Sequence, residues 1–345
     1  MNTRTKLMAL LGAALIGSGV AASNAAAATT LTMSSWVPPT HFVMTEILEP
    51  WAAEVAKVTE GRVAVRILPK PVGAPAQHWE LARRGVADVT WGNFTYEPER
   101  FKSIWFAEMP FSGANSAASS VALWETYEQY LSGHPAYAGV VMLGVGMLGG
   151  GALHHTSKPL VEAEDLRNQK VRMGGPIQKR LLEDFGAVPI AAPGPRAYEL
   201  LEGRVVDASL HSLESVIGFR LEDQLKHHTK IPDGLYDATF FIVINERKWN
   251  GLSAADREAI LSVSGAALSR RWGERFDAHN AAAEAALRER GNDFATPSAA
   301  LLERVRAVRE QMLAEWAADT AGIGVADPMA MVRFYEQRYQ ALAGK

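Results

Sequence analysis

The order of strands and helices that the sequence predicts occurs twice in the chain, and this repeat restricts the possible folds more than any other feature. Residues 30–92 follow the order strand, helix, strand, helix, strand, with a glycine after each helix. Residues 170–212 follow the same order with glycines at the same places. Identity between the two stretches is low, so the architecture repeats rather than the sequence. Two βαβαβ units predict an α/β protein of two lobes with mainly parallel sheets.

The elements of each unit follow from apolar periodicity and from the positions of glycine and proline. In the first unit we predict strands over residues 30–35, 63–68 and 86–92 and helices over 41–59 and 77–84. In the second unit we predict strands over residues 170–173, 188–192 and 205–212 and helices over 177–185 and 196–202. A proline-containing loop, "PKPVGAP" or "PGP", precedes the second helix of each unit, which supports this alignment of the two.

The rest of the chain is expected to connect and cover the two units. We predict strands over residues 140–145 and 235–245 and helices over 298–320 and 328–342. The second of these strands is apolar enough to be buried on both faces. A helical pattern also runs from Ser253 to about Arg290, with Gly265 and Gly273 inside it. A helix of that length would be about 50 Å long, which is enough to cross both lobes.

The first residues of the chain have the pattern of a secretory signal peptide. Arg4 and Lys6 precede an apolar stretch, residues 7–20, and the small residues 25–27 offer a cleavage site. A membrane anchor fits less well, because small residues dilute the apolar stretch and no charged stop follows it. The chain has no cysteine, so neither a lipid-modified cysteine nor a disulfide bond is possible. We therefore expect residues 1–27 to be removed and the protein to be periplasmic.

Net charge argues against nucleic-acid binding, and glycine content argues against a membrane span. The whole chain has a formal charge of -3, and removal of residues 1–27, which hold two basic and no acidic residues, moves it to -5. Nucleic-acid binding requires a basic surface, so this class is disfavoured. The uncharged run over residues 136–153 is interrupted by six glycines, so we predict a buried strand and a glycine loop there rather than a membrane span.

The repeat also predicts where a ligand would bind. In open α/β sheets, ligands lie beyond the carboxyl ends of the strands, near the N-termini of helices. Those strand ends are Ser34-Ser35-Trp36, Trp91-Gly92-Asn93, Arg172-Met173-Gly174 and Leu210-His211-Ser212. Two lobes that face each other across these ends enclose a cleft with aromatic planes, one guanidinium group and several small polar groups.

The chain has no motif of an enzyme or a metal site in the context that such a motif requires. There is no HExxH, no cysteine–histidine cluster, no G-x-S-x-G or S-x-x-K, and no P-loop. The G-x-G-x-x-G spacing at residues 144–149 begins inside the predicted strand 140–145, so no dinucleotide-type glycine fingerprint follows a strand. The adjacent histidine pairs at 154–155 and 227–228 do not point the same way on a strand or helix, so a zinc site is improbable. A pair of carboxylates that converge in space is not excluded. We expect no enzyme activity, no cofactor and no metal.

Several stretches, in order along the chain, resemble the solute-binding proteins of tripartite ATP-independent periplasmic (TRAP) transporters of the DctP type. They are "SSWVPPTHFVMTEILEPWAAEVAKVTEGRVAV", "GVADVTWGNFTYEPERF", "EMPF", "HHTSKPLVEAEDLRNQKVRM", "VVDASLHSLES" and "GLYDATFFIVINERKWNGLSAADREAI". The resemblance covers essentially all of the chain after residue 27. It implies a protein that closes on an organic acid and delivers it to a membrane permease driven by an ion gradient.

The resemblance implies a two-lobed periplasmic binding protein of type II-like architecture, with strands crossing between the lobes and a long helix spanning both. We place residues 28–149 and about 238–277 in the first lobe. Residues 150–237 and about 278–345, with the C-terminal helices, then form the second. The protein is expected to be a monomer or a homodimer.

The arginine that clamps the ligand carboxylate in this family corresponds to Arg172, in "DLRNQKVR". A planar guanidinium with paired donors fits a carboxylate, and dry walls strengthen the contact. His211 matches another frequent ligand contact, although a packing role is equally consistent. His155 corresponds to a position that is also histidine in a related branch. Trp36, Trp91 and Tyr96, near strand ends, are candidates for the ligand site or for the core, and Gly92 and Gly174 complete the predicted ligand-binding set.

Two positions depart from relatives. Arg196 stands where many have glutamate, and Leu213 stands where one branch has tryptophan, so the ligand chemistry is open. We predict a ligand with a carboxylate and a hydrophobic or aromatic body. A C4-dicarboxylate or sugar acid is the alternative within the class, and a second basic residue at the ligand's far end would favour it. From other classes, a periplasmic hydrolase or lyase, or the partner of an extracytoplasmic sensor, are the alternatives.

Overall fold

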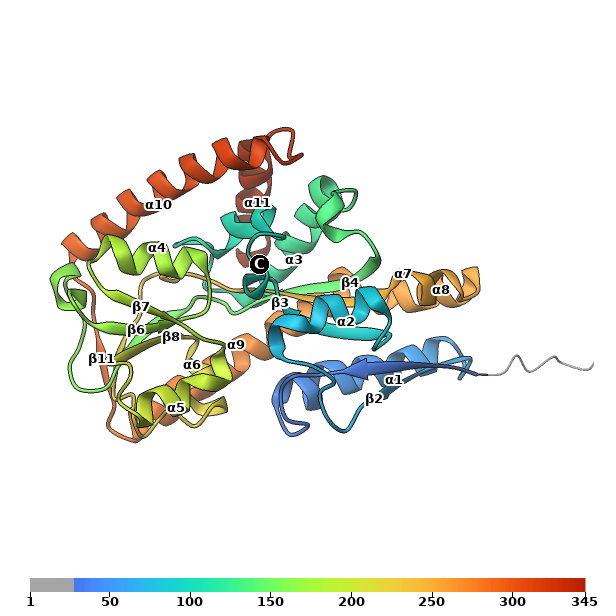
Figure 1. Ribbon diagram of the computed structural model, residues 1–345, viewed down its shortest axis with the longest axis horizontal. Coiled ribbons are helices and arrows are strands. Elements are labelled where there is room, and N and C mark those ends of the chain that lie inside the picture. The colour runs from blue at the N-terminus through green and yellow to red at the C-terminus, as the bar shows by residue number, and fades with distance from the viewer. Residues whose placement is uncertain (1–27, 345) are drawn as a thin grey trace, which may run out of the picture.

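The computed structural model describes residues 28–344, so the predicted signal peptide lies outside the described residues. The chain forms two β-sheets side by side, with helices on the faces of both and a helix, α9 (Ala266–Glu289), running between them (Figure 1). No helix in the described part of the chain has the length and apolar character needed to span a bilayer. The predicted two-lobed α/β fold is confirmed.

The first sheet has five strands in the order β2-β1-β3-β10-β4. Their bounds are β1 (Thr29–Ser34), β2 (Val63–Ile67), β3 (Val89–Asn93), β4 (Val140–Met147) and β10 (Thr239–Asn245). The strands of the first βαβαβ unit pair in parallel, β1 with both β2 and β3. β10 enters from the second half of the chain and pairs antiparallel with β3 and β4. All of its residues are buried, as the apolar run predicts.

The second sheet has six strands in the order β11-β9-β5-β8-β6-β7. Their bounds are β5 (Ala152–His155), β6 (Lys170–Met173), β7 (Val188–Ala191), β8 (Ala208–His211), β9 (His227–Thr229) and β11 (Asp293–Ala295). The second βαβαβ unit again pairs in parallel, β6 with β7 and β8. β5 is antiparallel to β8 and β9. Pairing within the repeated units is therefore parallel. The strands outside the units pair antiparallel with the units, whereas β11 pairs in parallel with β9, which also lies outside them.

The helices cover both sheets. The first unit carries α1 (Glu49–Val58), preceded by the π-helical turn η1 (Val43–Leu48), and α2 (His78–Arg84); the second carries α4 (Pro176–Asp184) and α5 (Ala197–Glu202). The others are α3 (Ser116–Thr126), α6 (Leu213–Gly218), α7 (Glu246–Asn250), α8 (Ala254–Ser262), α10 (Ala299–Ala321) and α11 (Pro328–Ala343). Side chains of Asn115, Ser253 and Ser298 cap α3, α8 and α10 by accepting hydrogen bonds from the first turn.

The single helix predicted from Ser253 to Arg290 is two helices. Gly265 has φ +60°, which a right-handed helix does not allow, so the chain turns between α8 and α9. The 24 residues of α9 still span about 36 Å, and they pack on α3 and β4 of one half and on α6 of the other. A Cβ at Gly273 would lie 2.3 Å from the Ala117 backbone, so this glycine lets α9 and α3 meet closely.

The two C-terminal helices lie on one face of the molecule (Figure 1). α10 packs against α4 and also against η4 (Lys102–Glu108), where the Trp316 indole N–H donates to the Lys102 carbonyl oxygen at 2.7 Å. α11 packs against α3, a helix of the first half of the chain. The assignment of residues 278–345 to the second lobe therefore needs correction for α11: its apolar face is buried on the first lobe.

Two segments cross between the sheets and meet at glycines. β4 continues through Leu148–Gly151 into β5, and the chain returns through residues 234–238 into β10. Gly150 and Gly234 touch, since a Cβ at Gly234 would lie 2.7 Å from the Gly150 Cα. The buried Asp237 carboxylate accepts hydrogen bonds from the backbone N–H groups of residues 148, 149 and 150, at 2.7, 3.2 and 3.1 Å. These hydrogen bonds hold residues 148–150 of the first crossing segment against Asp237 of the second.

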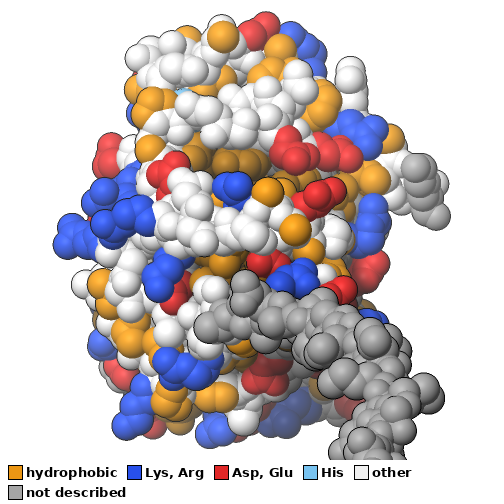
Figure 2. All heavy atoms as spheres, turned by 90° about the vertical axis from the view of Figure 1, so that its right-hand side faces the viewer, with side chains coloured by type: hydrophobic (Ala, Val, Ile, Leu, Met, Phe, Trp, Pro, Cys, Tyr) orange, Lys and Arg blue, Asp and Glu red, His pale blue; other side chains and the backbone are white. Residues whose placement is uncertain are grey.

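The surface carries both signs of charge. On the face shown in Figure 2, Lys and Arg side chains and Asp and Glu side chains are both present, and apolar atoms lie between them. Ion pairs on the surface join the two kinds of charge, for example Arg62 with Asp256 and Arg338 with Glu125.

Candidate functional site

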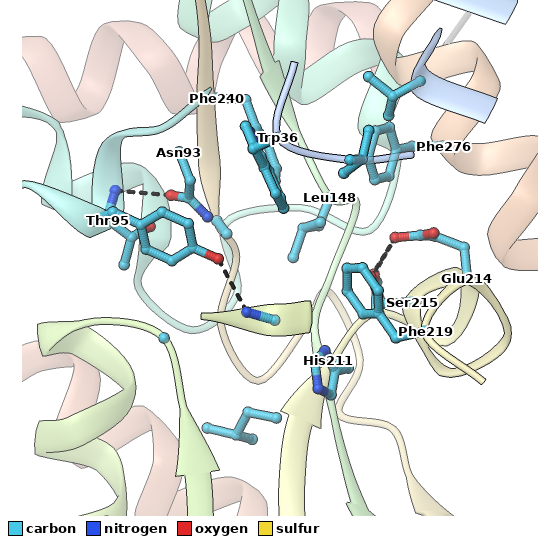
Figure 3. Close-up of a pocket in the computed structure, with 18 of the residues that line it drawn as sticks. Trp36, Asn93, Thr95, Leu148, His211, Glu214, Ser215, Phe219, Phe240 and Phe276 are labelled. Carbon is cyan, nitrogen blue, oxygen red and sulfur yellow. Dashed lines mark hydrogen bonds between the residues drawn. The ribbon is translucent and has the colours of Figure 1, made fainter. Parts of the chain in front are cut away.

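The principal pocket lies between the two sheets, at the carboxyl ends of the strands of both βαβαβ units. Trp36 and Trp91 come from the first half, Arg172 and His211 from the second, and Tyr236 from the returning crossing segment. Phe276 of α9 closes one side (Figure 3). The free volume of this pocket is about 60 Å³. This is the position that the carboxyl-end rule predicts for a ligand.

Arg172 lies at the bottom of this pocket, on β6, and is 4% exposed. Its Nε and Nη2 donate to the Ala192 carbonyl oxygen at 2.9 and 2.7 Å, and its Nη1 donates to that of Leu210 at 2.8 Å. Guanidinium has five N–H groups, so one more remains on each terminal nitrogen. Among the described residues, the only further neighbour within hydrogen-bond range is His211 Nε2, 3.5 Å from Nη1.

The charge of Arg172 has no acidic partner among residues 28–344. Burial lowers its pKa, while the nearby Tyr96 and Tyr236 hydroxyl groups act in the opposite direction. An arginine nevertheless remains protonated in proteins. Burying a cation beside neutral carbonyl groups alone has a desolvation free-energy cost, and an ion pair with an anion would offset part of that cost. The two remaining N–H groups of Arg172 have the geometry that suits the two oxygens of a carboxylate.

His211, at the end of β8, is a neutral neighbour of this cation. Burial first, and then the charge of Arg172, lower its pKa well below the usual value. A neutral ring leaves Nε2 able to accept from Arg172 Nη1 or from a ligand hydroxyl. The ring also packs against Phe219, with 5.9 Å between ring centroids.

His154, His228 and Asn292 form a chain of hydrogen bonds, the histidine row, which ends at the backbone carbonyl oxygen of His211. His154 Nε2 lies 3.1 Å from the His211 carbonyl oxygen, His154 Nδ1 lies 2.7 Å from His228 Nδ1, and Asn292 Nδ2 lies 3.0 Å from His228 Nε2. The carbonyl oxygen accepts only, so His154 Nε2 carries hydrogen, His228 Nδ1 donates to His154, and Asn292 donates to His228. Burial lowers the pKa of His154 to about 3 and that of His228 to about 4, which agrees with two neutral rings.

Aromatic rings form the opposite wall. Trp36 stacks at a tilt on Trp91, with 4.6 Å between ring centroids, and meets Tyr96 edge-on at 6.2 Å. The Trp91 indole N–H donates to Ser35 Oγ at 3.0 Å, which fixes this ring in the core. The Trp36 indole nitrogen has no hydrogen-bond partner among the described residues. Phe240 and Phe276 extend the apolar surface.

The two halves are in contact around the pocket, so this conformation is closed. The backbone N–H of Gly194, in the second half, donates to the Tyr96 hydroxyl at 3.1 Å. Gly175 lies directly against Thr95, because a Cβ on Gly175 would lie 1.7 Å from Thr95 Cγ2. Leu148 and Tyr236 form the pocket wall on the side of the crossing segments.

The structure brings six of the eight predicted ligand-binding residues to the pocket. These are Trp36, Trp91, Tyr96, Arg172, Gly174 and His211. His155 does not belong to this set, because β5 is antiparallel to β8 and its last residue pairs with Ala208, at the edge of the sheet away from His211. Its Nε2 instead bonds to Gln169 Oε1 at 2.9 Å. Gly92 faces the core, where a Cβ would lie 2.5 Å from the Phe241 ring.

Both departures from relatives lie outside the pocket. Arg196 is exposed and pairs with Glu199 at 2.8 Å. Leu213 is buried in a small core with Val216 and Leu287. Sequence reasoning missed several lining residues, namely Glu214, Phe219, Tyr236, Phe240 and Phe276. Asn93 also lines the pocket and was named at a predicted strand end, although not in the ligand-binding set. Glu214 lies two residues after the predicted strand 205–212, so a wider window would have included it, whereas Phe276 lies on a helix with no local signal.

No group of three or more His, Cys, Asp or Glu side chains within residues 28–344 is arranged to hold a metal ion. The fold and the pocket define a class: a two-lobed binding protein that encloses an anionic small molecule between its lobes. The family model for bacterial extracellular solute-binding proteins of family 7, DctP, matches residues 33–319. The chain belongs to this family and is a solute-binding protein of the TRAP transporter type, which delivers its solute to a membrane permease.

Individual relatives agree with this assignment. A TRAP periplasmic solute-binding protein from Bordetella bronchiseptica, solved with (R)- and (S)-mandelate, is 36% identical, with a TM-score of 0.87 over 91% of this chain and 99% of that chain. A marine metagenome TRAP solute-binding protein, in complex with metahydroxyphenylacetate, is 25% identical, with a TM-score of 0.84 over 91% and 99%. The protein TsaT of Comamonas testosteroni, named an outer membrane transporter protein, is 29% identical over 347 residues, 100% of both chains.

Proposed function

We propose that this solute-binding protein captures an aromatic monocarboxylic acid and holds its carboxylate on Arg172. The observation that supports this proposal is a buried arginine that has no acidic partner within residues 28–344 and that shares its pocket with several aromatic rings. The ligands of the two similar structures, mandelate and metahydroxyphenylacetate, have the same two parts, a carboxylate and an aromatic ring.

The pocket disfavours the dicarboxylate alternative. Arg172 is the only lysine or arginine among the residues that line it in the described part of the chain. A second ligand carboxylate would therefore enter a dry site without a cation and would approach Glu214, which also lines the pocket. Placing two like charges in such a site is strongly unfavourable. A ligand with one carboxylate avoids both costs.

We further propose that the ligand is released unchanged to a permease, that residues 1–27 direct the protein to the periplasm, and that it works there without a cofactor. The lobes are proposed to be the two sheets with their helices, with α11 on the first. This proposal predicts recovery of unaltered acid after incubation with the protein. Any turnover product would favour the hydrolase or lyase alternative.

The experiment is a thermal-shift screen of the protein from residue 28 onward against aromatic monocarboxylates, C4-dicarboxylates and sugar acids, followed by calorimetry of each ligand found. A ligand at 100 times its dissociation constant stabilises the native state by about 2.7 kcal/mol. We expect mandelate and phenylacetate to raise the melting temperature and succinate to have no effect. Stabilisation by succinate alone would contradict the proposed ligand class.

A further inference from the structure

The hydroxyl group of Tyr96 lies at the pocket, between the two lobes. Tyr96 ends the short turn η3 (Phe94–Tyr96), which follows β3 in the first lobe. Asn93 holds this turn, because its Oδ1 accepts from the Thr95 backbone N–H at 2.8 Å. Thr95 Oγ1 donates in addition to the buried carboxyl group of Glu108 at 2.9 Å. The first lobe itself therefore fixes the turn that carries the Tyr96 ring.

Only the oxygen atom of this hydroxyl group has a partner in the protein. The Gly194 backbone N–H of the second lobe donates to it at 3.1 Å, and this is the only hydrogen bond of the Tyr96 side chain within residues 28–344. An N–H group cannot accept, so the contact leaves the phenol hydrogen free to donate. Burial raises the pKa of the hydroxyl group, although the charge of Arg172 acts in the opposite direction, so Tyr96 keeps its hydrogen.

This free hydrogen is close to the free N–H groups of Arg172. Gly194, which contacts Tyr96, lies two residues after Ala192, whose carbonyl oxygen accepts from Arg172 Nε and Nη2. Both side chains line the pocket, and each acts on the pKa of the other. In the described part of the chain, no hydrogen bond joins them. Two groups with unused donor hydrogens thus lie beside one pocket, where a ligand acceptor can satisfy both.

We propose that the Tyr96 hydroxyl group donates to the ligand carboxylate that Arg172 binds, while its oxygen accepts from the Gly194 N–H. This inference rests on the proposed function and adds a second carboxylate-binding group, contributed by the first lobe. A carboxylate has about four lone-pair sites, so it can accept from a guanidinium and a phenol at once. A hydroxyl group that donates becomes a stronger acceptor, so the bound carboxylate also strengthens the contact with Gly194. One hydroxyl group thereby couples ligand binding to lobe closure.

Tyr236 is the natural comparison for Tyr96. It is the other phenol that acts on Arg172, it lines the same pocket, and it is 2% exposed. It belongs to the crossing segment that leads into β10, and its hydroxyl group has no hydrogen bond to the second lobe within residues 28–344. Tyr236 therefore shares the environment of Arg172 but lacks the contact through which Tyr96 joins the lobes.

The first test is the affinity of Tyr96→Phe, which deletes one hydroxyl group and keeps the ring. Hydrogen bonds to charged groups change affinity by about tenfold to a hundredfold, and Tyr96→Phe should bind phenylacetate more weakly by about that factor. The loss should appear mainly as faster dissociation, because the closed complex loses a contact that holds it. Tyr198→Phe, at an exposed position of α5, is the matched control and should bind within about twofold of the wild type. Calorimetry and stopped-flow fluorescence measure these effects, with folding checked by circular dichroism.

The second test separates donation to the ligand from a role in closure alone. Infrared difference spectra of phenylacetate, isotope-labelled at its carboxyl carbon, report the hydrogen bonds of the bound carboxylate. We expect the antisymmetric carboxylate band to move to higher frequency in Tyr96→Phe, because the carboxylate has lost a donor, and to stay unchanged in Tyr198→Phe. The same spectrum of Tyr236→Phe shows whether the other phenol is the donor.

The outcomes separate this inference from the proposed function. If phenylacetate binds and Arg172→Ala strongly weakens its binding, but Tyr96→Phe binds within about threefold of the wild type, the inference fails and the proposed function stands. The inference fails in the same way if Tyr96→Phe weakens binding without moving the carboxylate band, or if the band moves in Tyr236→Phe alone. If no aromatic acid binds at all, the proposed function is wrong, and the role of Tyr96 in it is wrong as well.

Discussion

Arg172 carries its charge in a site where the polar neighbours from the described part of the chain are carbonyl groups, a neutral histidine and two tyrosines. Removing it would leave a ligand carboxylate buried without a cation. Losses of this kind are about 2 to 5 kcal/mol, so Arg172→Ala should weaken binding of an aromatic acid about 30- to 3,000-fold. Arg172→Lys retains charge but not the planar pair of donors, and should recover only part of the affinity. Calorimetry, with folding checked by circular dichroism, measures both.

A control for Arg172 has to be an arginine outside the pocket. Arg196 is suitable because it is exposed and pairs only with Glu199 on the surface. Arg180 is less suitable, since it joins α4 to α10 through Glu315 and also pairs with Asp184 of its own helix. If Arg196→Ala abolished binding while Arg172→Ala bound within threefold of wild type, the carboxylate site would have to be moved to the "PGPRAY" loop.

The histidine row behind His211 gives the protein a measurable response to pH. His228 is neutral in the fold, where its pKa is lowered to about 4 by burial, and titrates near 6.5 when unfolded. Between these values the unfolded chain binds a proton that the folded chain does not. Stability therefore falls as the pH drops through this window, by about 1.4 kcal/mol per pH unit from this group.

His228→Gln removes this titration while retaining a side-chain N–H that can donate to His154. We expect the unfolding free energy of the variant to fall less steeply than that of the wild type as the pH drops from 6.5 to 4. The two slopes should differ by about 1.4 kcal/mol per pH unit. Urea unfolding at several pH values measures both slopes. Equal slopes for the two proteins would show that His228 is protonated in the folded state.

At the scale of elements, the crossing segments depend on one carboxylate. Asp237 receives three N–H groups from residues 148–150, and burial raises its pKa to about 7. Asp237→Asn keeps the shape but replaces one acceptor oxygen with a donor that faces backbone N–H groups. Unsatisfied buried groups of this kind cost about 1 to 3 kcal/mol, so the unfolding free energy should fall by about that amount. Asp223→Asn, whose side chain is 77% exposed, should change it by less than about 0.5 kcal/mol.

The elements differ in how far the sequence predicts them. The strands and helices of both βαβαβ units occur where periodicity and glycines place them, because each element buries one face and ends at a residue that stops it. The break at Gly265 was not predictable from the pattern, since glycine is also tolerated inside helices, as at Gly273. The strands β5, β9 and β11 were not predicted, because they are only three or four residues long and their pairing depends on residues far apart in the sequence.

The residues of the pocket also differ in how far the sequence predicts their positions. Arg172 was predictable because its strand end and its family motif coincide. His155 was misplaced because the direction of β5 is set by β8 and β9, not by its own residues. His154 and His228 form their contact across paired strands, so neither adjacent histidine pair signals it. Phe276 enters the pocket only because α9 crosses it.

At the scale of the whole molecule, the lobes have to separate for a ligand to reach the buried Arg172, and close again around it. Scattering should therefore show a smaller radius of gyration with saturating ligand than without. Equal radii in the two states would argue against closure on binding. Closure brings Gly175 against Thr95 and Gly194 against Tyr96, so the close contacts between these loops belong to the closed form.

Gly175 does not itself line the pocket, and a substitution there can hinder closure. Its backbone is extended, with φ -160°, so alanine is not strained there, but the new Cβ would lie 1.7 Å from Thr95 Cγ2 in the closed form. Gly175→Ala should fold normally and resist closure. Overpacking of this kind costs about 1 to 3 kcal/mol, which predicts a loss of affinity of about fivefold to 150-fold and little or no compaction in scattering.

The methyl group that collides with alanine can be removed separately. Thr95→Ser deletes Cγ2 and retains the hydroxyl that donates to Glu108 at 2.9 Å, so the double variant Gly175→Ala/Thr95→Ser should regain most of the affinity. Gly133→Ala is the control for glycine substitution, because a Cβ there meets nothing within 4 Å. If Gly175→Ala alone bound ligand as tightly as the wild type, or if Thr95→Ser gave no recovery, contact between these two residues would not limit closure.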